Sequence, residues 1–180
     1  MRPLLALALL AVVANPALAQ NRATTADPAR FAAVAETLIE RRIAAERTLF
    51  APNAPPLAHE QTLAAIARGR SADMADGAPF AHEDSQGHFV AADRVRASFG
   101  PYGSIGENIM EMNSTALYSA ELFAETAVNG WMKSPGHRAN ILDPAFDTSG
   151  IGVAVVGNHA FATQLFRGPP ERIARRTPTK

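Results

Sequence analysis

Three residues of this chain combine reactive side chains with neighbours that shape the backbone. His82 follows an apolar residue and precedes a turn sequence, Glu107 enters an apolar segment behind a glycine, and His137 follows a Ser-Pro-Gly sequence that we expect to form a turn. Turns beside rigid elements are where proteins often display functional groups. Two imidazoles and one carboxylate are the ligand set of a catalytic-type zinc site with an open fourth position. The residues therefore predict a site for Zn²⁺ or another divalent metal.

A metal-free arrangement explains the same residues. His82 and His137 can form a hydrogen-bonded pair that organises a cavity, with Glu107 neutralising or orienting an imidazole, and such a site would still titrate near neutrality. A serine triad is not indicated, because Ser134 precedes a proline and no oxyanion-hole motif accompanies it. Both readings of the histidines stay open at this point.

Hydrophobic periodicity indicates the elements that must position these side chains. Apolar residues recur at helical spacing in four segments. The predicted helices cover residues 27–47, 60–74, 89–97 and 119–132. Residues 107–110 are predicted as a strand, and alternating apolar residues on both sides of Gly157-Asn158 predict a β-hairpin over 151–166. The expected architecture is one α/β domain with helices packed on a small, mainly antiparallel sheet.

The N-terminal segment has the features of a secretory signal peptide. Arg2 precedes an apolar run, Pro16 ends that run, and Ala17-Leu18-Ala19 matches the small-residue cleavage signal. We therefore expect cleavage near Ala19 and a secreted or periplasmic protein. The predicted divisions are a signal peptide at 1–19, a flexible segment at 20–26, the domain at 27–168 and a disordered basic tail at 169–180.

Composition excludes several classes of function. The 180 residues carry 17 Lys and Arg against 17 Asp and Glu, which argues against a nucleic-acid partner and against electrostatic docking on anionic lipid. The absence of cysteine excludes disulfides, a thiol nucleophile and a cysteine-containing zinc site. No segment after the signal peptide is apolar enough to predict a transmembrane helix.

Several motifs together resemble the CAP superfamily (the cysteine-rich secretory, antigen 5 and pathogenesis-related-1 proteins), and in particular its bacterial secreted branch. The motifs are Phe80-Ala81-His82, Asp93-Arg94-Val95, Gly106-Glu107-Asn108-Ile109, Trp131 through Leu142, and Gly150-Ile151-Gly152-Val153. The resemblance implies an α-β-α sandwich with a cavity that holds two histidines and two acidic residues. In this chain it assigns the first histidine to His82, the first acid to Glu107 and the second histidine to His137.

The chain departs from the family pattern at one cavity position. The second family glutamate usually lies three residues after the helix tryptophan, Trp131, and here that position is Ser134. The cavity is therefore expected to retain three of its four members and to have lost one negative charge. Four neighbours are predicted to support the site structurally: Asn108 by satisfying backbone groups, Trp131 as a core residue, and Arg138 and Asn140 by holding the segment after His137.

Two functional hypotheses follow from the resemblance and the residues. The first is an exported binding or interaction module, with His82, Glu107 and His137 on the floor of a cleft for a lipid, a peptide or a cell-envelope component. The alternative is a metal-dependent hydrolase of the protease type, in which zinc on the two histidines activates water and Glu107 acts as ligand or general base. We favour the binding module, because the resemblance links the family to lipid binding and signalling more securely than to catalysis.

Overall fold

The computed structural model describes residues 23–101 and 103–170. Five helices and four strands follow one another in the described chain. They are α2 (Pro28–Phe50), β1 (Ala58–His59), α3 (Gln61–Ala75), α4 (Val90–Phe99), β2 (Ile105–Asn113), α5 (Ala120–Lys133), α6 (Pro135–Leu142), β3 (Thr148–Val156) and β4 (His159–Arg167). The four predicted helices, the strand and the hairpin are all present. Each helix starts one residue later than its sequence pattern indicates and ends one to three residues later, whereas the strand and the hairpin extend further at both ends.

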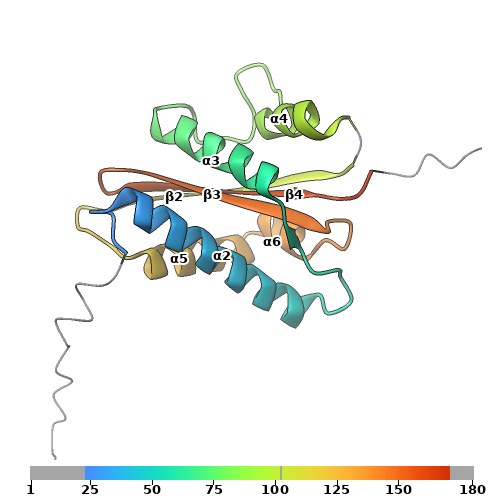
Figure 1. Cartoon of the computed structure of the whole chain (residues 1–180), viewed down its shortest axis with the longest axis horizontal. Helices are drawn as coiled ribbons and strands as arrows, with labels where there is room; N and C mark the ends of the chain where they lie inside the picture. The colour runs from blue at the N-terminus through green and yellow to red at the C-terminus, as the bar shows by residue number, and fades with distance from the viewer. Residues whose placement is uncertain (1–22, 102, 171–180) are drawn as a thin grey trace, which may run out of the picture.

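The strands form one sheet that lies between two layers of helices. Their order is β1-β3-β4-β2, with antiparallel pairing except between the two-residue strand β1 and β3, which are parallel. Helices α3 and α4 cover one face of the sheet, and α2, α5 and α6 cover the other (Figure 1). This arrangement confirms the predicted α/β class and the α-β-α sandwich.

The long helix α2 begins where the sequence predicts. Asp27 is its N-cap and accepts a hydrogen bond from the Arg30 amide, and Pro28 occupies the first helical position, where a proline needs no amide hydrogen. The inward face is apolar at helical spacing and includes Phe31, Ile39 and Ile43, each at most 2% exposed. This face packs against α5 and the sheet to form the larger core cluster.

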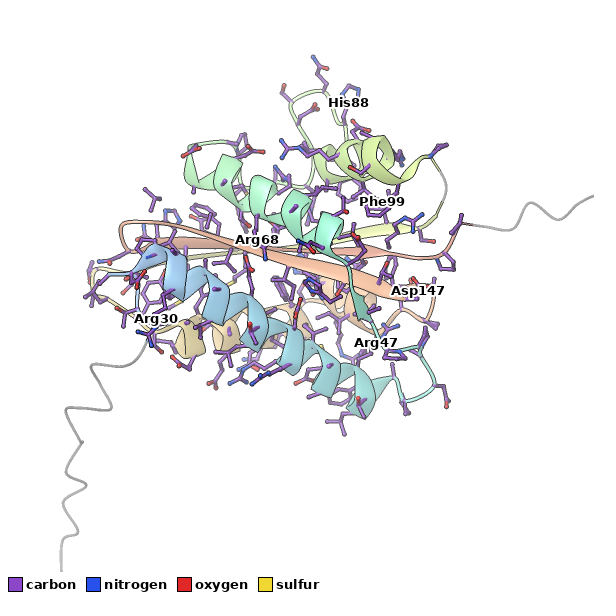
Figure 2. All side chains as sticks on the ribbon, in the orientation of Figure 1. Arg30, Arg47, Arg68, His88, Phe99 and Asp147 are labelled. Carbon is purple, nitrogen blue, oxygen red and sulfur yellow. The ribbon has the colours of Figure 1, made fainter. Side chains whose placement is uncertain are left out.

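Arg47 ties the end of α2 to the segment that follows α6. The side chain, labelled in Figure 2, is buried. Its guanidinium donates hydrogen bonds to the carbonyls of Pro55, Ile141, Asp143 and Phe146 at 2.7–2.9 Å. These four hydrogen bonds compensate for the free-energy cost of burying the charged guanidinium. A single side chain thereby fixes where α6 ends relative to α2.

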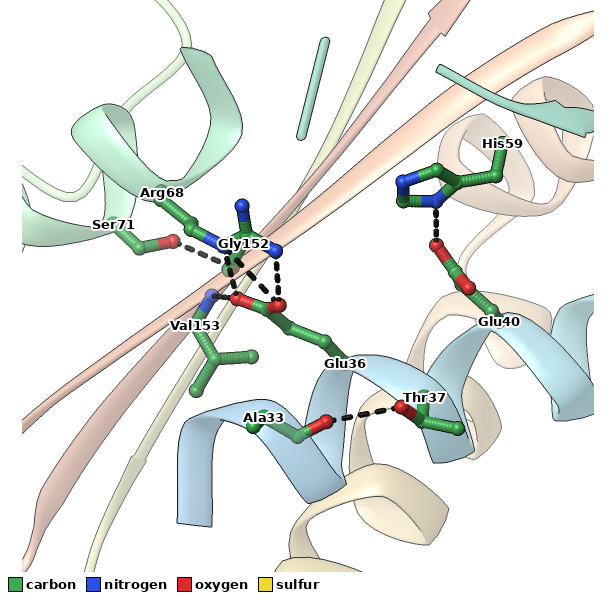
Figure 3. Close-up of polar contacts among 9 residues, drawn as sticks. All are labelled: Ala33, Glu36, Thr37, Glu40, His59, Arg68, Ser71, Gly152 and Val153. Carbon is green, nitrogen blue, oxygen red and sulfur yellow. Dashed lines mark hydrogen bonds and ion pairs between the residues drawn. The ribbon is translucent and has the colours of Figure 1, made fainter. Parts of the chain in front are cut away.

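Glu36 makes a second link, between α2, α3 and the sheet (Figure 3). Its carboxylate accepts two close hydrogen bonds from the Arg68 guanidinium, at 2.9 Å and 2.6 Å, and one from the Val153 amide at 3.1 Å. Strand β1 pairs only with residues 148 and 149 of β3, so Val153 has no neighbouring strand on that side. The carboxylate takes the place of a strand carbonyl and satisfies this edge amide.

Two glycines of β3 let helix α3 lie directly on the sheet. A Cβ on Gly150 would stand 2.1 Å from the Ala64 nitrogen, and one on Gly152 would stand 2.0 Å from the Arg68 nitrogen. Both obstacles are backbone atoms of α3, which cannot move aside as a flexible side chain would. The Gly-x-Gly spacing places both residues on the same face of the strand, so the close approach extends along the helix.

One local prediction is wrong. The Ser-Pro-Gly sequence at 134–136 does not form a turn, because Ser134 is extended and Pro135 starts the new helix α6. The flexibility of segment 20–26 stays a prediction, and within it a bridge joins Thr24 to Ser119 and Ala23 is buried. The predicted signal peptide and all but two residues of the predicted tail lie outside the described residues.

No helix in the described part of the chain combines the length and apolar character needed to cross a membrane.

The close approach of α3 predicts a large difference between two glycine substitutions. Gly152→Ala should lower the free energy of unfolding by about 3 kcal/mol, since the added methyl group overlaps the α3 backbone. Gly130→Ala is the matched control: a Cβ there meets nothing within 4 Å, and alanine favours the helix by about 1 kcal/mol. Urea unfolding of both variants measures the difference, and equal midpoints would contradict the packing described.

Candidate functional site

A cavity of about 450 Å³ opens at the β2 edge of the sheet. Three parts of the chain line it: the loop between α3 and α4, the start of β2, and the start of α6. Its lining includes His82 from the loop, Glu107 from β2 and His137 from α6. The tertiary structure therefore brings the three residues singled out by their chemistry into one cavity, although they lie far apart in sequence.

Glu107 is the buried centre of this arrangement. Its side chain is fully inaccessible to solvent, and each of its carboxylate oxygens has its own partner. Arg70 of α3 donates from Nε to Oε1 at 3.2 Å, and His82 Nδ1 lies 2.8 Å from Oε2. Arg70 is itself buried and also donates from Nη2 to the Ala81 carbonyl at 2.7 Å. The carboxylate and the guanidinium together fix the backbone that carries His82.

The contact with Glu107 orients His82. The carboxylate is paired with the Arg70 guanidinium and accepts hydrogen bonds, so Nδ1 of His82 supplies the proton between the two groups. In the neutral imidazole, the lone pair then lies on Nε2. His82 remains accessible, with 43% of its side chain exposed. Orientation by a carboxylate in this way is a common feature of histidines that bind metals or move protons.

His137 lies beside His82 in the cavity. The ring centroids are 5.7 Å apart and the rings are inclined at 61°. Partial burial, and secondarily the neighbouring His82, lower the pKa of His137, while Glu107 opposes the shift. The lowered pKa, caused chiefly by burial, therefore favours an uncharged His137 at neutral pH.

A ladder of side-chain amides ties α6 to β2 beneath the histidines. Asn140 donates from Nδ2 to the Glu107 carbonyl at 3.1 Å and to Oδ1 of Asn108 at 3.0 Å. Asn108 in turn donates from Nδ2 to the His137 carbonyl at 3.2 Å. The buried Trp131 donates from its indole nitrogen to the Ile109 carbonyl at 2.8 Å. These contacts set the position of His137 relative to Glu107.

Arg138 and Ser134 occupy different environments near the site. The Arg138 guanidinium lies 5.3 Å from the centre of the Phe50 ring, so its contact joins α6 to the end of α2. Ser134 is the N-cap residue of α6 and lines the cavity, but its side chain makes no capping hydrogen bond. The position of the second family acid therefore faces the cavity and carries a hydroxyl group in place of a carboxylate.

Sequence reasoning missed Arg70, the partner of the buried carboxylate. Its only signal is the pattern of α3, in which Arg70 lies on the same buried face as Ala67 and Met74. A charged residue on an apolar helix face requires a buried partner of opposite charge. The remaining histidines lie outside the cavity and each contacts a carboxylate: His59 with Glu40, His88 with Asp84 and His159 with Glu111. His88 extends away from the sheet (Figure 2).

The geometry bears on which of these residues could hold a metal ion. Within residues 23–101 and 103–170, no group of three or more His, Cys, Asp and Glu side chains is arranged to hold a metal ion. Glu107 does not fit the role of ligand, because both of its oxygens are engaged and it is inaccessible. Of the two imidazoles, His82 has the contact with an outer carboxylate that orients many zinc-binding histidines, and His137 lies beside it.

The environment of His137 predicts its titration. His82→Gln should raise the pKa of His137 towards its ordinary value of about 6.5, because the substitution removes a neighbouring positive charge. In the wild type the pKa is lowered on folding, so the unfolded chain binds more protons just below pH 6.5. Stability therefore falls as the pH drops through that window, and the penalty is absent above it. NMR of the imidazole carbons measures the shift. His88→Gln is the control, and an unchanged His137 in the His82 variant would contradict the coupling.

Comparison with known proteins identifies relatives among bacterial proteins. A stretch of 114 residues, 63% of this chain, is 37% identical to the Bacillus subtilis protein YkwD and covers 40% of it. The structure matches an extracellular protein of Bacillus anthracis that contains an SCP domain, with a TM-score of 0.61 and 30% identity over 80% of this chain and 43% of that one. The chain thus spans less than half the length of both relatives.

Two more distant structures show the same fold. A cysteine-rich secretory protein of Staphylococcus aureus has a TM-score of 0.54 at 18% identity, over 77% of this chain and 40% of that one. An outer surface protein of Borrelia burgdorferi has a TM-score of 0.62 at 17% identity, over 74% and 92%. The model of the cysteine-rich secretory protein (CAP) family matches residues 41–166, which include the whole cavity. The predicted resemblance is confirmed: this chain belongs to the cysteine-rich secretory protein family.

Proposed function

We propose that the chain is an exported binding module whose ligand occupies the cavity at the β2 edge. The observation that carries this proposal is the state of Glu107. A hydrolase that uses Glu107 as general base or metal ligand needs a carboxylate oxygen that can reach water or metal. Here Arg70 and His82 engage both oxygens, and the side chain is inaccessible. Glu107 is thus a positioning group, which favours binding over hydrolysis.

The cavity offers two kinds of surface to a ligand. His82, His137 and Asn140 contribute polar side chains, whereas Phe89 and Ile105 contribute apolar ones. A ligand with a polar group attached to an apolar part matches this division, as in a lipid, a peptide or another component of the cell envelope. A volume of about 450 Å³ accommodates part of such a molecule.

Export rests on two observations. The first 19 residues have the composition of a signal peptide, and we propose cleavage near Ala19. The Bacillus anthracis relative, 30% identical over most of this chain, is an extracellular protein. A secreted or periplasmic location would place the cavity in contact with envelope components.

A substitution that fills the cavity tests the proposed ligand site. Gly136 lines the cavity, and a Cβ there meets nothing within 4 Å, so Gly136→Phe should fold normally and occupy ligand space. We expect the wild-type protein purified from its native envelope to carry a small molecule detectable by native mass spectrometry. The Gly136→Phe protein should carry at least tenfold less.

Gly130→Phe is the matched control, because Gly130 is equally unobstructed and lies outside the cavity lining. Equal ligand content in all three proteins would place the ligand elsewhere. An absence of ligand in all three, together with hydrolysis of an envelope peptide by the wild type, would favour the hydrolase.

We further propose that the two imidazoles bind a divalent metal weakly, with Glu107 as an outer carboxylate. Bound zinc would supply a Lewis acid beside the ligand. His137→Ala should weaken zinc binding by at least about tenfold, and binding should also weaken at pH 5.5, where protons compete for both histidines. Ser134→Glu should tighten binding, because it restores a negative charge to the cavity. Calorimetry at pH 7.5 and 5.5 measures these changes. His88→Ala is the control. Equal zinc affinity in every variant would show that zinc does not bind in this cavity.

A further inference from the structure

A second cavity, of about 250 Å³, lies on the α2 side of the sheet towards the β1 edge. It is separate from the histidine cavity, which opens at the opposite, β2 edge. Helix α2, the segment around β1, and the strands β3 and β4 contribute to it. Its lining includes Ile43, Ala44, Leu57, His59, Ser149 and Gln164.

Gln164 is a buried polar residue of this cavity whose side chain lacks hydrogen-bond partners. The residue lies in β4, between Asn108 of β2 and Ile151 of β3, and is 0% exposed. Neither Oε1 nor Nε2 of its side chain has a hydrogen-bond partner. In the part of the chain that the structure describes, these two atoms are the only buried side-chain nitrogen or oxygen atoms without one.

The contrast with other buried polar side chains is informative. Arg47, Arg70 and Asn108 each find protein partners at 3.2 Å or less. Gln164 instead lines the cavity together with aliphatic residues such as Ile43 and Ala44 of α2, and the polar lining residues, among them Ser149, make no hydrogen bond to its side chain. Buried polar groups are almost always satisfied, and an exception calls for a partner outside the protein chain. A leucine or methionine would fill this position without the penalty of an unpaired amide.

We infer that this second cavity binds a carboxamide group, with Gln164 as the residue that recognises it. A glutamine side chain presents a donor and an acceptor side by side, and a second amide presents the complementary pair in the same plane. A ketone could satisfy only Nε2. A carboxylate would place its negative charge against Oε1, and the opposite charges of Arg41 and Glu40, which also line the cavity, offset each other.

The walls restrict the size and character of the ligand. Ile43, Ala44 and Leu57 are aliphatic, so a short aliphatic group attached to the amide fits them. At the same cavity, His59 contacts Glu40 and joins β1 to α2 (Figure 3). A cavity of about 250 Å³ suits a small carboxamide or the side chain of a glutamine in a peptide.

NMR of the side-chain amides tests this inference on the wild-type chain itself. The Nε2 resonances of Gln164 are identified by their loss in Gln164→Met, a substitution that keeps the length of the side chain and removes its unpaired amide. Titration with isobutyramide should shift these resonances along a saturable curve with a dissociation constant of roughly 1 mM, as expected for so small a ligand. Isobutyrate and 3-methyl-2-butanone, of the same shape, should bind at least tenfold more weakly.

Two variants separate recognition from packing. Gln164→Met should weaken isobutyramide binding at least tenfold, measured by ligand saturation transfer, while its melting temperature stays equal to or above that of the wild type. Gln61→Met, at an exposed position, is the matched control and should bind normally. Ala44→Leu should block the cavity while leaving Gln164 in place. If one of the two cavity variants, Gln164→Met or Ala44→Leu, does not fold, loss of isobutyramide binding in the other still tests the inference.

Titration with short peptides shows whether the recognised amide belongs to a peptide or to a small molecule. Tighter binding of Gly-Gln-Gly than of isobutyramide indicates a peptide ligand, and binding of isobutyramide alone indicates a small molecule. Gly-Glu-Gly is the control. Equal binding of isobutyramide, 3-methyl-2-butanone and isobutyrate would overturn the proposal. Gln164 amide resonances that do not shift during the titration, and whose protons exchange only with water, would also overturn it. None of these outcomes depends on the histidine cavity.

Discussion

The salt bridge between Glu107 and Arg70 is the interaction on which the histidine cavity depends. A carboxylate with no access to solvent is stable only when its charge is compensated, and a guanidinium from α3 provides that compensation across the face of the sheet. Oε2 of Glu107 orients His82, and Nη2 of Arg70 donates a hydrogen bond to the Ala81 carbonyl. One buried ion pair therefore fixes strand, helix and loop together. Loss of either partner would leave a buried charge unpaired.

The position of Arg70 follows in turn from the packing of α3. Gly150 and Gly152 let the helix backbone touch β3, and Glu36 holds Arg68 against the same strand. These contacts act at the β1–β3 side of the sheet, whereas the histidine cavity opens at the β2 side. Because α3 crosses the sheet between them, its close contact with β3 helps to determine how far Arg70 reaches towards Glu107. The family glycines thus support the site from a distance.

The two cavities differ in whether their buried polar groups have hydrogen-bond partners within the protein. Around Glu107 the buried carboxylate, the Arg70 guanidinium and the side-chain amides of Asn108 and Asn140 have protein partners, and the histidines are the groups that remain available to a ligand. At Gln164 the protein leaves both side-chain amide atoms unpaired, in a cavity that aliphatic and polar residues line together. The first arrangement is typical of a preorganised site, in which an outer layer of hydrogen bonds holds the accessible groups. The second is typical of a site that an outside molecule completes.

Sequence alone determined most of the helices and strands of this protein and singled out three residues that line its histidine cavity. Periodicity predicts the helices and the hairpin because burial of one face imposes a local pattern, and the spaced motifs around His82, Glu107 and His137 indicate the family. Periodicity does not show that Pro135 begins a helix, that residues 23–26 are held against the core, or that Arg70 pairs with Glu107. Those features depend on contacts between segments distant in the chain. Whether a buried charge or amide finds a partner is decided only when the layers pack together.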